Sequence, residues 1–151
     1  MRHRLHSICP YFAMFPERFV QKHLVWSNEG DLVFDPFCGR GTTILESLLF
    51  GRNAIGSDIN PVAVCVSKAK ACPPDEWEIH RRITEIENEF CEIDAEGFDE
   101  FFHWCFEIDT FREILKLREV LDWRNNRVDA FIAAVSLGLL HGESHKTKNC
   151  F

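Results

Sequence analysis

The chain has 151 residues, a length typical of a single domain. Its 17 Lys and Arg and 24 Asp and Glu residues give a formal net charge of −7. This charge excludes a self-sufficient basic nucleic-acid-binding module, but it leaves open a DNA-contacting part that lies elsewhere. The longest apolar stretch, residues 130–140, falls well short of the ~20 residues of a membrane span. Seven scattered cysteines, an odd number, favour free thiols in a reducing cytoplasm over a disulfide framework.

The first third of the chain alternates between predicted helices and strands. Apolar residues at helical spacing, short apolar runs and Gly or Pro boundaries define these elements. A strand, a glycine turn, a helix and a second strand within about 30 residues form a βαβ unit with parallel strands. The predicted elements are a helix that starts with Pro16 as its first residue and runs to about Leu24, a strand over 32–34, a helix over 42–50, a strand over 54–58 and a helix over 62–70.

The second half, after Pro73-Pro74, is expected to be mostly helical. Helices are predicted over 77–93, from Asp109 to about Leu121, and from an Asn126 cap onward, while the aromatic-rich segment 97–106 has no clear assignment. The residues expected to face inward are Ile79, Ile83, Ile86, Phe90 and Ile93 in the first helix, Phe111, Ile114, Leu115 and Leu117 in the second, and Val128, Phe131, Ile132, Val135 and Leu139 in the third.

The most informative segment is the glycine turn after the first strand. Asp35-Pro36-Phe37-Cys38-Gly39-Arg40-Gly41-Thr42-Thr43 lies at the carboxyl end of a parallel strand, where α/β sheets bind ligands. Glycines there let the backbone bend and approach a ligand closely. Asp58, about twenty residues on, is placed to accept the two hydroxyls of a ribose.

The spacing of the glycines narrows the class of ligand. The third glycine of a dinucleotide fingerprint is missing after Gly41, and the turn lacks the lysine of a phosphate-binding P-loop. A nucleoside cofactor without phosphates remains, and S-adenosylmethionine is its obvious member.

The run DPFCGRGTT followed by GRNAIGSDINPVAV resembles the cofactor-binding motifs of DNA methyltransferases that modify the exocyclic amine of N4-cytosine or N6-adenine. The upstream HSICPYFAMFPERFVQKHL resembles the helix that closes the cofactor pocket in that family, and the resemblance covers roughly residues 5–70. The later stretches FFHWCFEIDTFREILKLREVL and SLGLLHGESHK resemble the helical insert of some members.

The resemblance implies a Rossmann-like α/β fold with S-adenosylmethionine as cofactor. Residues 1–72 would then be the cofactor-binding region, and 73–151 a helical segment. Asp35 and the backbone of 38–41 would surround the methionine moiety, Asp58 would hold the ribose, Ile59 would pack on the adenine, and Phe15-Pro16 would line the open side. The complete set of expected cofactor-binding residues is Phe15, Pro16, Asp35, Pro36, Phe37, Cys38, Gly39, Gly41, Thr42, Thr43, Asp58, Ile59 and Asn60.

The family's catalytic (D/N/S)-P-P-(Y/F/W) motif has no counterpart in this sequence. The one Pro-Pro pair, Pro73-Pro74, follows Cys72 and precedes Asp75, and is interpreted as a linker turn. We therefore expect the cofactor half of a truncated methyltransferase, inactive alone. Its DNA contacts would come from a C-terminal remainder or a second subunit, within a restriction-modification system. An RNA or small-molecule methyltransferase and a non-catalytic remnant remain alternatives.

Three weaker signals favour ordinary structural roles. The spacings of His103, Cys105, His141, His145 and Cys150 match no closed zinc site, so no metal is expected. The basic residues 2–6 are interpreted as a solvated terminus. The aromatic cluster over 98–106 is interpreted as packing between helices rather than as a base-stacking surface.

Overall fold

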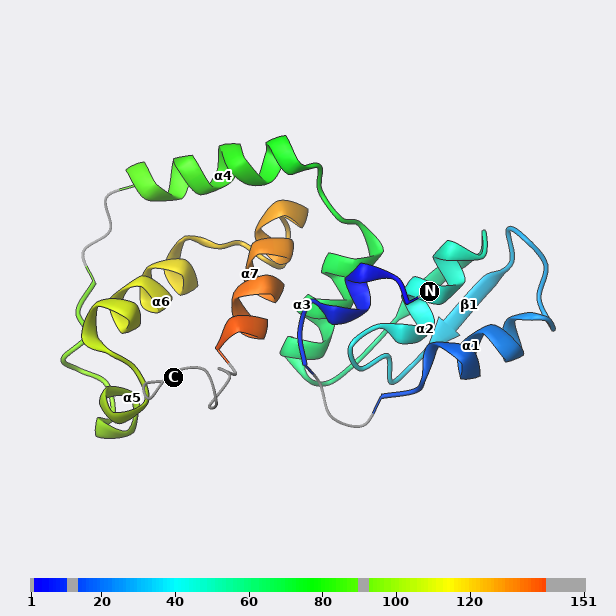
Figure 1. The fold of residues 1–151 in the computed structure, drawn as a ribbon, viewed down its shortest axis with the longest axis horizontal. Helices are drawn as coiled ribbons and strands as arrows, with labels where there is room; N and C mark the ends of the chain where they lie inside the picture. Colours follow the sequence, from blue (N-terminus) through cyan, green and yellow to red (C-terminus); the bar gives the residue numbers. More distant parts are fainter. Residues whose placement is uncertain (1, 11–13, 90–92, 141–151) are drawn as a thin grey trace.

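The computed structural model describes residues 2–10, 14–89 and 93–140 (Figure 1). Within these residues, none of the helices is long and apolar enough to cross a membrane. The elements in chain order are η1 (Arg4–Ser7), α1 (Glu17–Leu24), β1 (Leu32–Asp35), α2 (Thr42–Leu49), β2 (Asn53–Gly56), α3 (Pro61–Ala71), α4 (Glu76–Asn88), α5 (Glu100–Cys105), α6 (Ile108–Val120) and α7 (Arg127–Leu139).

The two strands lie side by side in parallel, as the βαβ pattern predicts, with Leu32 opposite Asn53 and Asp35 opposite Gly56. The molecule is thus mostly helical with a small parallel sheet, which is compatible with an α/β fold. The expectation that the second strand reaches Asp58 is wrong, because β2 ends at Gly56. The carboxylate of Asp58 accepts the N–H of Asn60 at 2.9 Å, and this local turn replaces the extended strand.

Two prolines lie at helix starts in different ways. Pro61 is the first residue of α3, and the Asn60 side chain caps the helix by accepting the Val62 N–H at 3.0 Å. Pro16 was expected as the first helical residue of α1, but its ψ of 143° is extended, and it precedes the helix as the N-cap. The missing N–H of Pro16 costs nothing in either position.

In the second half, the predicted helices are present with shifted ends. α4 begins with a capping box between Asp75 and Glu78. It ends at Asn88 rather than at 93, because Glu89 is extended with ψ 119°. α6 begins at Ile108, and its N-cap is Glu107 rather than Asp109, which lies inside the helix. Asn126 caps α7 as predicted. The segment without assignment contains α5.

Three residues expected to face inward are exposed instead. Ile83, Val135 and Leu139 are exposed, whereas the helix contacts of α4 and α7 bury Ile86 and Ile132. The apolar stripe of each helix is therefore wider than the face covered by its neighbours. Phe90, also expected inward, lies outside the described residues.

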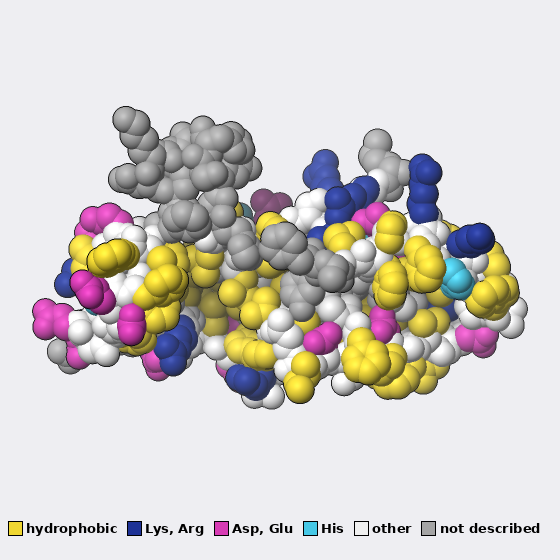
Figure 2. All heavy atoms as spheres, turned by 90° about the horizontal axis from the view of Figure 1, so that it is seen from below, with side chains coloured by type: hydrophobic (Ala, Val, Ile, Leu, Met, Phe, Trp, Pro, Cys, Tyr) yellow, Lys and Arg dark blue, Asp and Glu magenta, His cyan; other side chains and the backbone are white. Residues whose placement is uncertain are grey.

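The largest of the three hydrophobic clusters of the described residues lies around α3, between the βαβ half and the helical half in Figure 1. Cys65, Val66 and Ala69 of α3 pack with Ala134 of α7 and with Cys9 of the N-terminal segment. Figure 2 shows hydrophobic side chains at the surface on the face it displays. Exposed aliphatic and aromatic side chains on the sheet include Leu32, Phe34 and Ile55.

Candidate cofactor site

The glycine turn connects the carboxyl end of β1 to the first residue of α2, as predicted. Gly39 and Gly41 have φ angles of 50° and 74°, in the left-handed region that favours glycine. The turn is closed by the Gly41 N–H, which donates to the Cys38 carbonyl at 2.8 Å. Gly41 also lies against α3, because a Cβ atom at Gly41 would meet the Cα of Ser67 at 2.9 Å.

Asp58 and the glycine turn are joined directly. The Gly39 N–H donates to Asp58 Oδ2 at 2.8 Å, and the Asn60 N–H donates to Oδ1. These two backbone donors hold the pKa of Asp58 below its ordinary value of 3.8. Each carboxylate oxygen keeps a second lone pair, so the ionised group can accept two further hydrogen bonds.

The other residues predicted at the turn are of two kinds. Asp35 and Cys38 contact neighbouring groups of the protein, whereas Pro36 and Phe37 are exposed to solvent. Asp35 accepts the Phe37 N–H at 3.1 Å. Cys38 is buried with its thiol 3.6 Å from the Ser67 hydroxyl, and burial raises the pKa of this thiol above 9.0, so it is protonated at neutral pH. Pro36 and Phe37 are exposed, and Phe37 has 84% of its surface accessible.

Thr42 and Thr43 form the first turn of α2. Thr42 is buried, and within the described residues its hydroxyl has no hydrogen-bond partner. Thr43 is half-buried.

Ile59 is fully exposed beside Asp58. Phe15 and Pro16, the other expected apolar contacts, are also exposed and precede α1, where Phe15 stacks on Phe19 with ring centroids 4.9 Å apart. The structure therefore brings Asp58 to the turn, while the closure of the site by Phe15 and Pro16 stays a prediction.

A buried polar network that the sequence did not predict lies behind the turn. His6, which was expected in a solvated terminus, is instead fully buried, and its Nε2 lies 2.7 Å from Oε1 of the buried Glu46 on α2. The Arg40 guanidinium donates to the His6 carbonyl, and Lys70 of α3 donates to the Arg40 carbonyl. The motif spacing carries no signal for this network, because its members are 30 to 40 residues apart.

Burial controls the charge states in this network. It lowers the pKa of Lys70 from 10.5 to about 7, aided by the nearby Arg40. It also lowers the pKa of His6 below 6.5, against the opposing effects of Glu46 and Glu17. The N-terminal segment is held in place as well, because Arg2 pairs with Glu17 at 2.9 Å.

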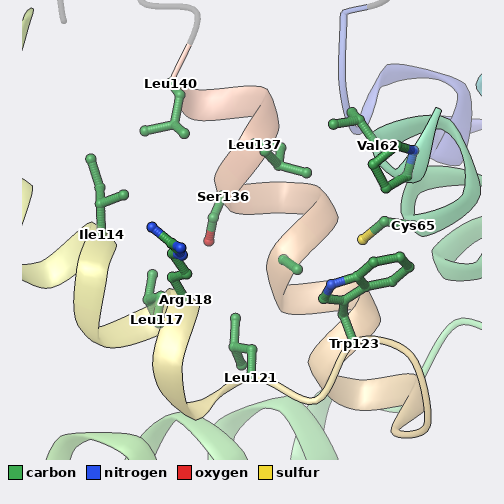
Figure 3. A pocket seen from close by; sticks show the side chains of 12 residues that line it. Val62, Cys65, Ile114, Leu117, Arg118, Leu121, Trp123, Ser136, Leu137 and Leu140 are labelled. Carbon is green, nitrogen blue, oxygen red and sulfur yellow. The ribbon is translucent and has the colours of Figure 1, made fainter. Parts of the chain in front are cut away.

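An apolar cavity of about 350 Å³ lies on another face of α3, between α6 and α7 (Figure 3). Val62 and Cys65 line it from α3, and Trp123 from the loop that precedes α7. A second cavity of about 760 Å³ is lined by residues of the N-terminal segment, α1 and α2. Neither of these two cavities includes a predicted cofactor-binding residue.

Two of the weaker sequence signals can be assessed in the described residues. Phe98 and Phe102 pack on the buried Phe111, with ring centroids 5.3 and 5.6 Å apart, which confirms a packing role for this part of the aromatic cluster. Trp104 is 82% exposed, against that expectation. The described part of the chain has no cluster of three potential metal ligands, and His141, His145 and Cys150 lie outside it.

Comparison with known proteins shows which family this part of the chain is similar to. Residues 2–69 match the family of N6- and N4-type DNA methylases. The similarity to amino-methylating DNA methyltransferases inferred from DPFCGRGTT and SDINPVAV is thereby confirmed for this segment.

The chain is similar to three curated methyltransferases. It is 51% identical over 49 residues to the orphan methyltransferase M.BamHII of Bacillus amyloliquefaciens, an alignment that covers 32% of this chain and 18% of the relative. It is 32% identical over 102 residues to the type II methyltransferase M.MjaII of Methanocaldococcus jannaschii, covering 64% and 19% of the two chains. It is 40% identical over 55 residues to the type II methyltransferase M.MvaI of Kocuria varians, covering 36% and 12%.

The matched segments thus span less than a fifth of each of these relatives. The alignment with the Methanocaldococcus protein covers 64% of this chain, so it includes residues outside 2–69. No solved structure matches the chain significantly.

Proposed function

We propose that the chain binds S-adenosylmethionine at the glycine turn, within a Rossmann-like methyltransferase fold. The reaction it serves is methylation of the exocyclic amine of adenine or cytosine in DNA. The observation that carries the proposal is the hydrogen bond between Gly39 and Asp58, which joins the turn after β1 to the acid after β2. The match of residues 2–69 to amino-methylating DNA methylases supports the choice of cofactor and substrate.

The residues at the turn fit this cofactor chemically. Asp58 is an ionised acceptor with lone pairs for the two ribose hydroxyls. Ile59, fully exposed next to it, offers an apolar surface to an adenine ring. The glycines carry no side chains that would keep the methionine moiety away from the backbone of the turn.

In this proposal, the bound cofactor supplies an electrophilic methyl group on a sulfonium sulfur for direct displacement by a base amine. The chain's own contribution is orientation. Asp35 and the backbone of 38–41 surround the methionine moiety, Asp58 holds the ribose, and Phe15 and Pro16 line the open side. Holding reactants in one geometry is a large part of the rate gain in a transfer of this kind.

The chain on its own binds the cofactor without transferring its methyl group, because the 151 residues contain no (D/N/S)-P-P-(Y/F/W) motif to accept the amine's protons and stack the base. The catalytic motif and the DNA contacts come from polypeptide outside these residues, on the same chain or on a second subunit. The net charge of −7 agrees with a DNA-contacting surface that lies outside them.

Isothermal titration of the full chain with S-adenosylmethionine tests this function. We expect binding by the wild-type chain and at least about tenfold weaker binding by Asp58→Ala, which removes the charge-assisted bonds to the ribose. Asp109→Ala is the matched control, since Asp109 is an exposed acid on α6 that pairs with Arg112. No binding by the folded wild-type chain, or equal binding by Asp58→Ala, would contradict the proposal.

A further inference from the structure

Two side chains of α3 contact the backbone of the glycine turn from behind. The Ser67 hydroxyl donates to the Gly39 carbonyl at 2.8 Å, and Lys70 Nζ donates to the Arg40 carbonyl. Residues three apart lie on the same face of a helix. One face of α3 therefore binds two successive carbonyls of the turn.

These two bonds also fix the direction of the amides of the turn. No cis peptide bond is present in the described residues. In a trans peptide the C=O of one residue and the N–H of the next point in opposite directions. Holding the carbonyls of Gly39 and Arg40 toward α3 thus turns the N–H groups of Arg40 and Gly41 away from α3, and the Gly41 N–H closes the turn by donating to the Cys38 carbonyl at 2.8 Å.

The contact between the turn and α3 is close, and it buries a titratable side chain. Gly41 lies so close to α3 that a Cβ atom there would meet Ser67 Oγ at 2.7 Å. Lys70 is 1% exposed, and an ammonium buried to this degree carries a large desolvation cost. The charged or titratable groups around Lys70 are Arg40 of the turn, Arg2, His6 and Cys9 of the N-terminal segment, and Glu17 of α1.

We propose that Ser67 and Lys70 are positioning residues for cofactor binding. They hold the peptide planes of the glycine turn in the orientation that receives the cofactor, and they do not touch it. This inference rests on the proposed function of the turn. It adds one face of α3 to a cofactor site that otherwise consists of the glycine turn and Asp58.

Calorimetric titration of the full chain with S-adenosylmethionine measures the effect. Ser67→Ala removes one donor, and Lys70→Met removes the other while keeping an unbranched side chain that is one atom shorter. We expect each to weaken binding by about threefold to tenfold, the effect of one lost hydrogen bond. Ser67→Ala also serves as the second variant if Lys70→Met does not fold.

The chain offers a matched control for each substitution. Ser47→Ala removes a fully buried hydroxyl on α2, which has no partner within the described residues. Lys68→Met removes an ammonium from the same helix, where it donates to the Arg124 carbonyl rather than to the turn. Both controls should bind the cofactor as the wild type does.

A spectroscopic measurement separates positioning from a general loss of stability. In ¹H–¹⁵N spectra of the cofactor-free chain, Ser67→Ala and Lys70→Met should shift the amide signals of Arg40 and Gly41, and the controls should not. A residue that only stabilised the core would lower the unfolding midpoint and leave both these signals and the affinity of the folded chain unchanged.

The outcomes distinguish the two proposals. Wild-type binding with unchanged affinity in Ser67→Ala and in folded Lys70→Met would overturn the positioning role and leave the proposed function standing. Absence of binding by the folded wild-type chain would overturn the proposed function, and the positioning role with it.

Discussion

The carboxylate of Asp58, two residues beyond β2, accepts the backbone N–H of Gly39 at 2.8 Å in the turn that follows β1. One side chain thus joins the ends of both strands at the place where a parallel sheet binds its ligands. The bond also keeps the acid in its ionised form, because the Gly39 and Asn60 N–H groups favour the negative charge.

The first prediction concerns the titration of this acid. The folded pKa of Asp58 is lowered, so its contribution to stability is present above its ordinary pKa of 3.8 and is lost as the pH falls through the folded value. A carboxyl ¹³C titration should give a midpoint below 3.8 for Asp58. A midpoint at or above 3.8 would contradict the two backbone hydrogen bonds.

The second prediction concerns Gly41. Gly41→Ala places a Cβ atom 2.7 Å from Ser67 Oγ at a φ of 74°, so both strain and overpacking oppose it. We expect the free energy of unfolding in urea to fall by about 2–5 kcal/mol.

Gly30→Ala is the matched control for this substitution. Its φ of 84° is also positive, but a Cβ atom there meets nothing within 4 Å. It should carry only the backbone strain of about 1–2 kcal/mol. An equal decrease in the free energy of unfolding of the two variants would contradict the close packing of Gly41 against α3.

The sequence predicts the turn and its acid well, because the signals for them are local. Gly39 and Gly41, the strand before them and Pro61 after Asp58 all lie within one βαβ unit. The buried network of His6, Glu46 and Lys70 could not be predicted in this way, because its contacts join segments that are far apart in sequence. Periodicity places apolar residues on a helix face, but it does not say how much of that face a neighbour covers, so Leu139 is exposed against expectation.

The third prediction follows from the lowered pKa of Lys70. Between about pH 7 and 10.5 the unfolded chain binds a proton at Lys70 that the folded chain has released. This group therefore makes the free energy of unfolding rise with pH in that window, by up to about 1.4 kcal/mol per pH unit. Urea unfolding at pH 7, 8 and 9 should show a smaller rise in Lys70→Met than in the wild type. Parallel curves would contradict the shifted pKa.

The fourth prediction concerns the ion pair that joins α4 to α7. Arg82 Nε donates to Oδ1 of Asp129 at 2.7 Å, and Asp129 is 1% exposed. Asp129→Ala removes this partner from Arg82, which keeps Glu85 at 3.5 Å and the Val120 carbonyl at 2.9 Å. It also removes the acceptor of the Asp122 N–H. We expect the free energy of unfolding to fall by about 2–4 kcal/mol.

The exposed pair of Asp109 and Arg112, at 3.2 Å, provides the comparison. Asp109→Ala should cost less than about 1 kcal/mol, because solvent screens an exposed pair. Similar losses in Asp129→Ala and Asp109→Ala would rule out a buried pair between α4 and α7.

Binding of S-adenosylmethionine at the glycine turn can be measured residue by residue in an amide-resolved ¹H–¹⁵N titration of the full chain with this cofactor. We expect saturable shifts at Gly39, Gly41, Asp58 and Ile59, with little change at Leu117 and Trp123, which line the cavity between α6 and α7. Shifts centred on that cavity, or no shifts in a folded chain at millimolar cofactor, would contradict it.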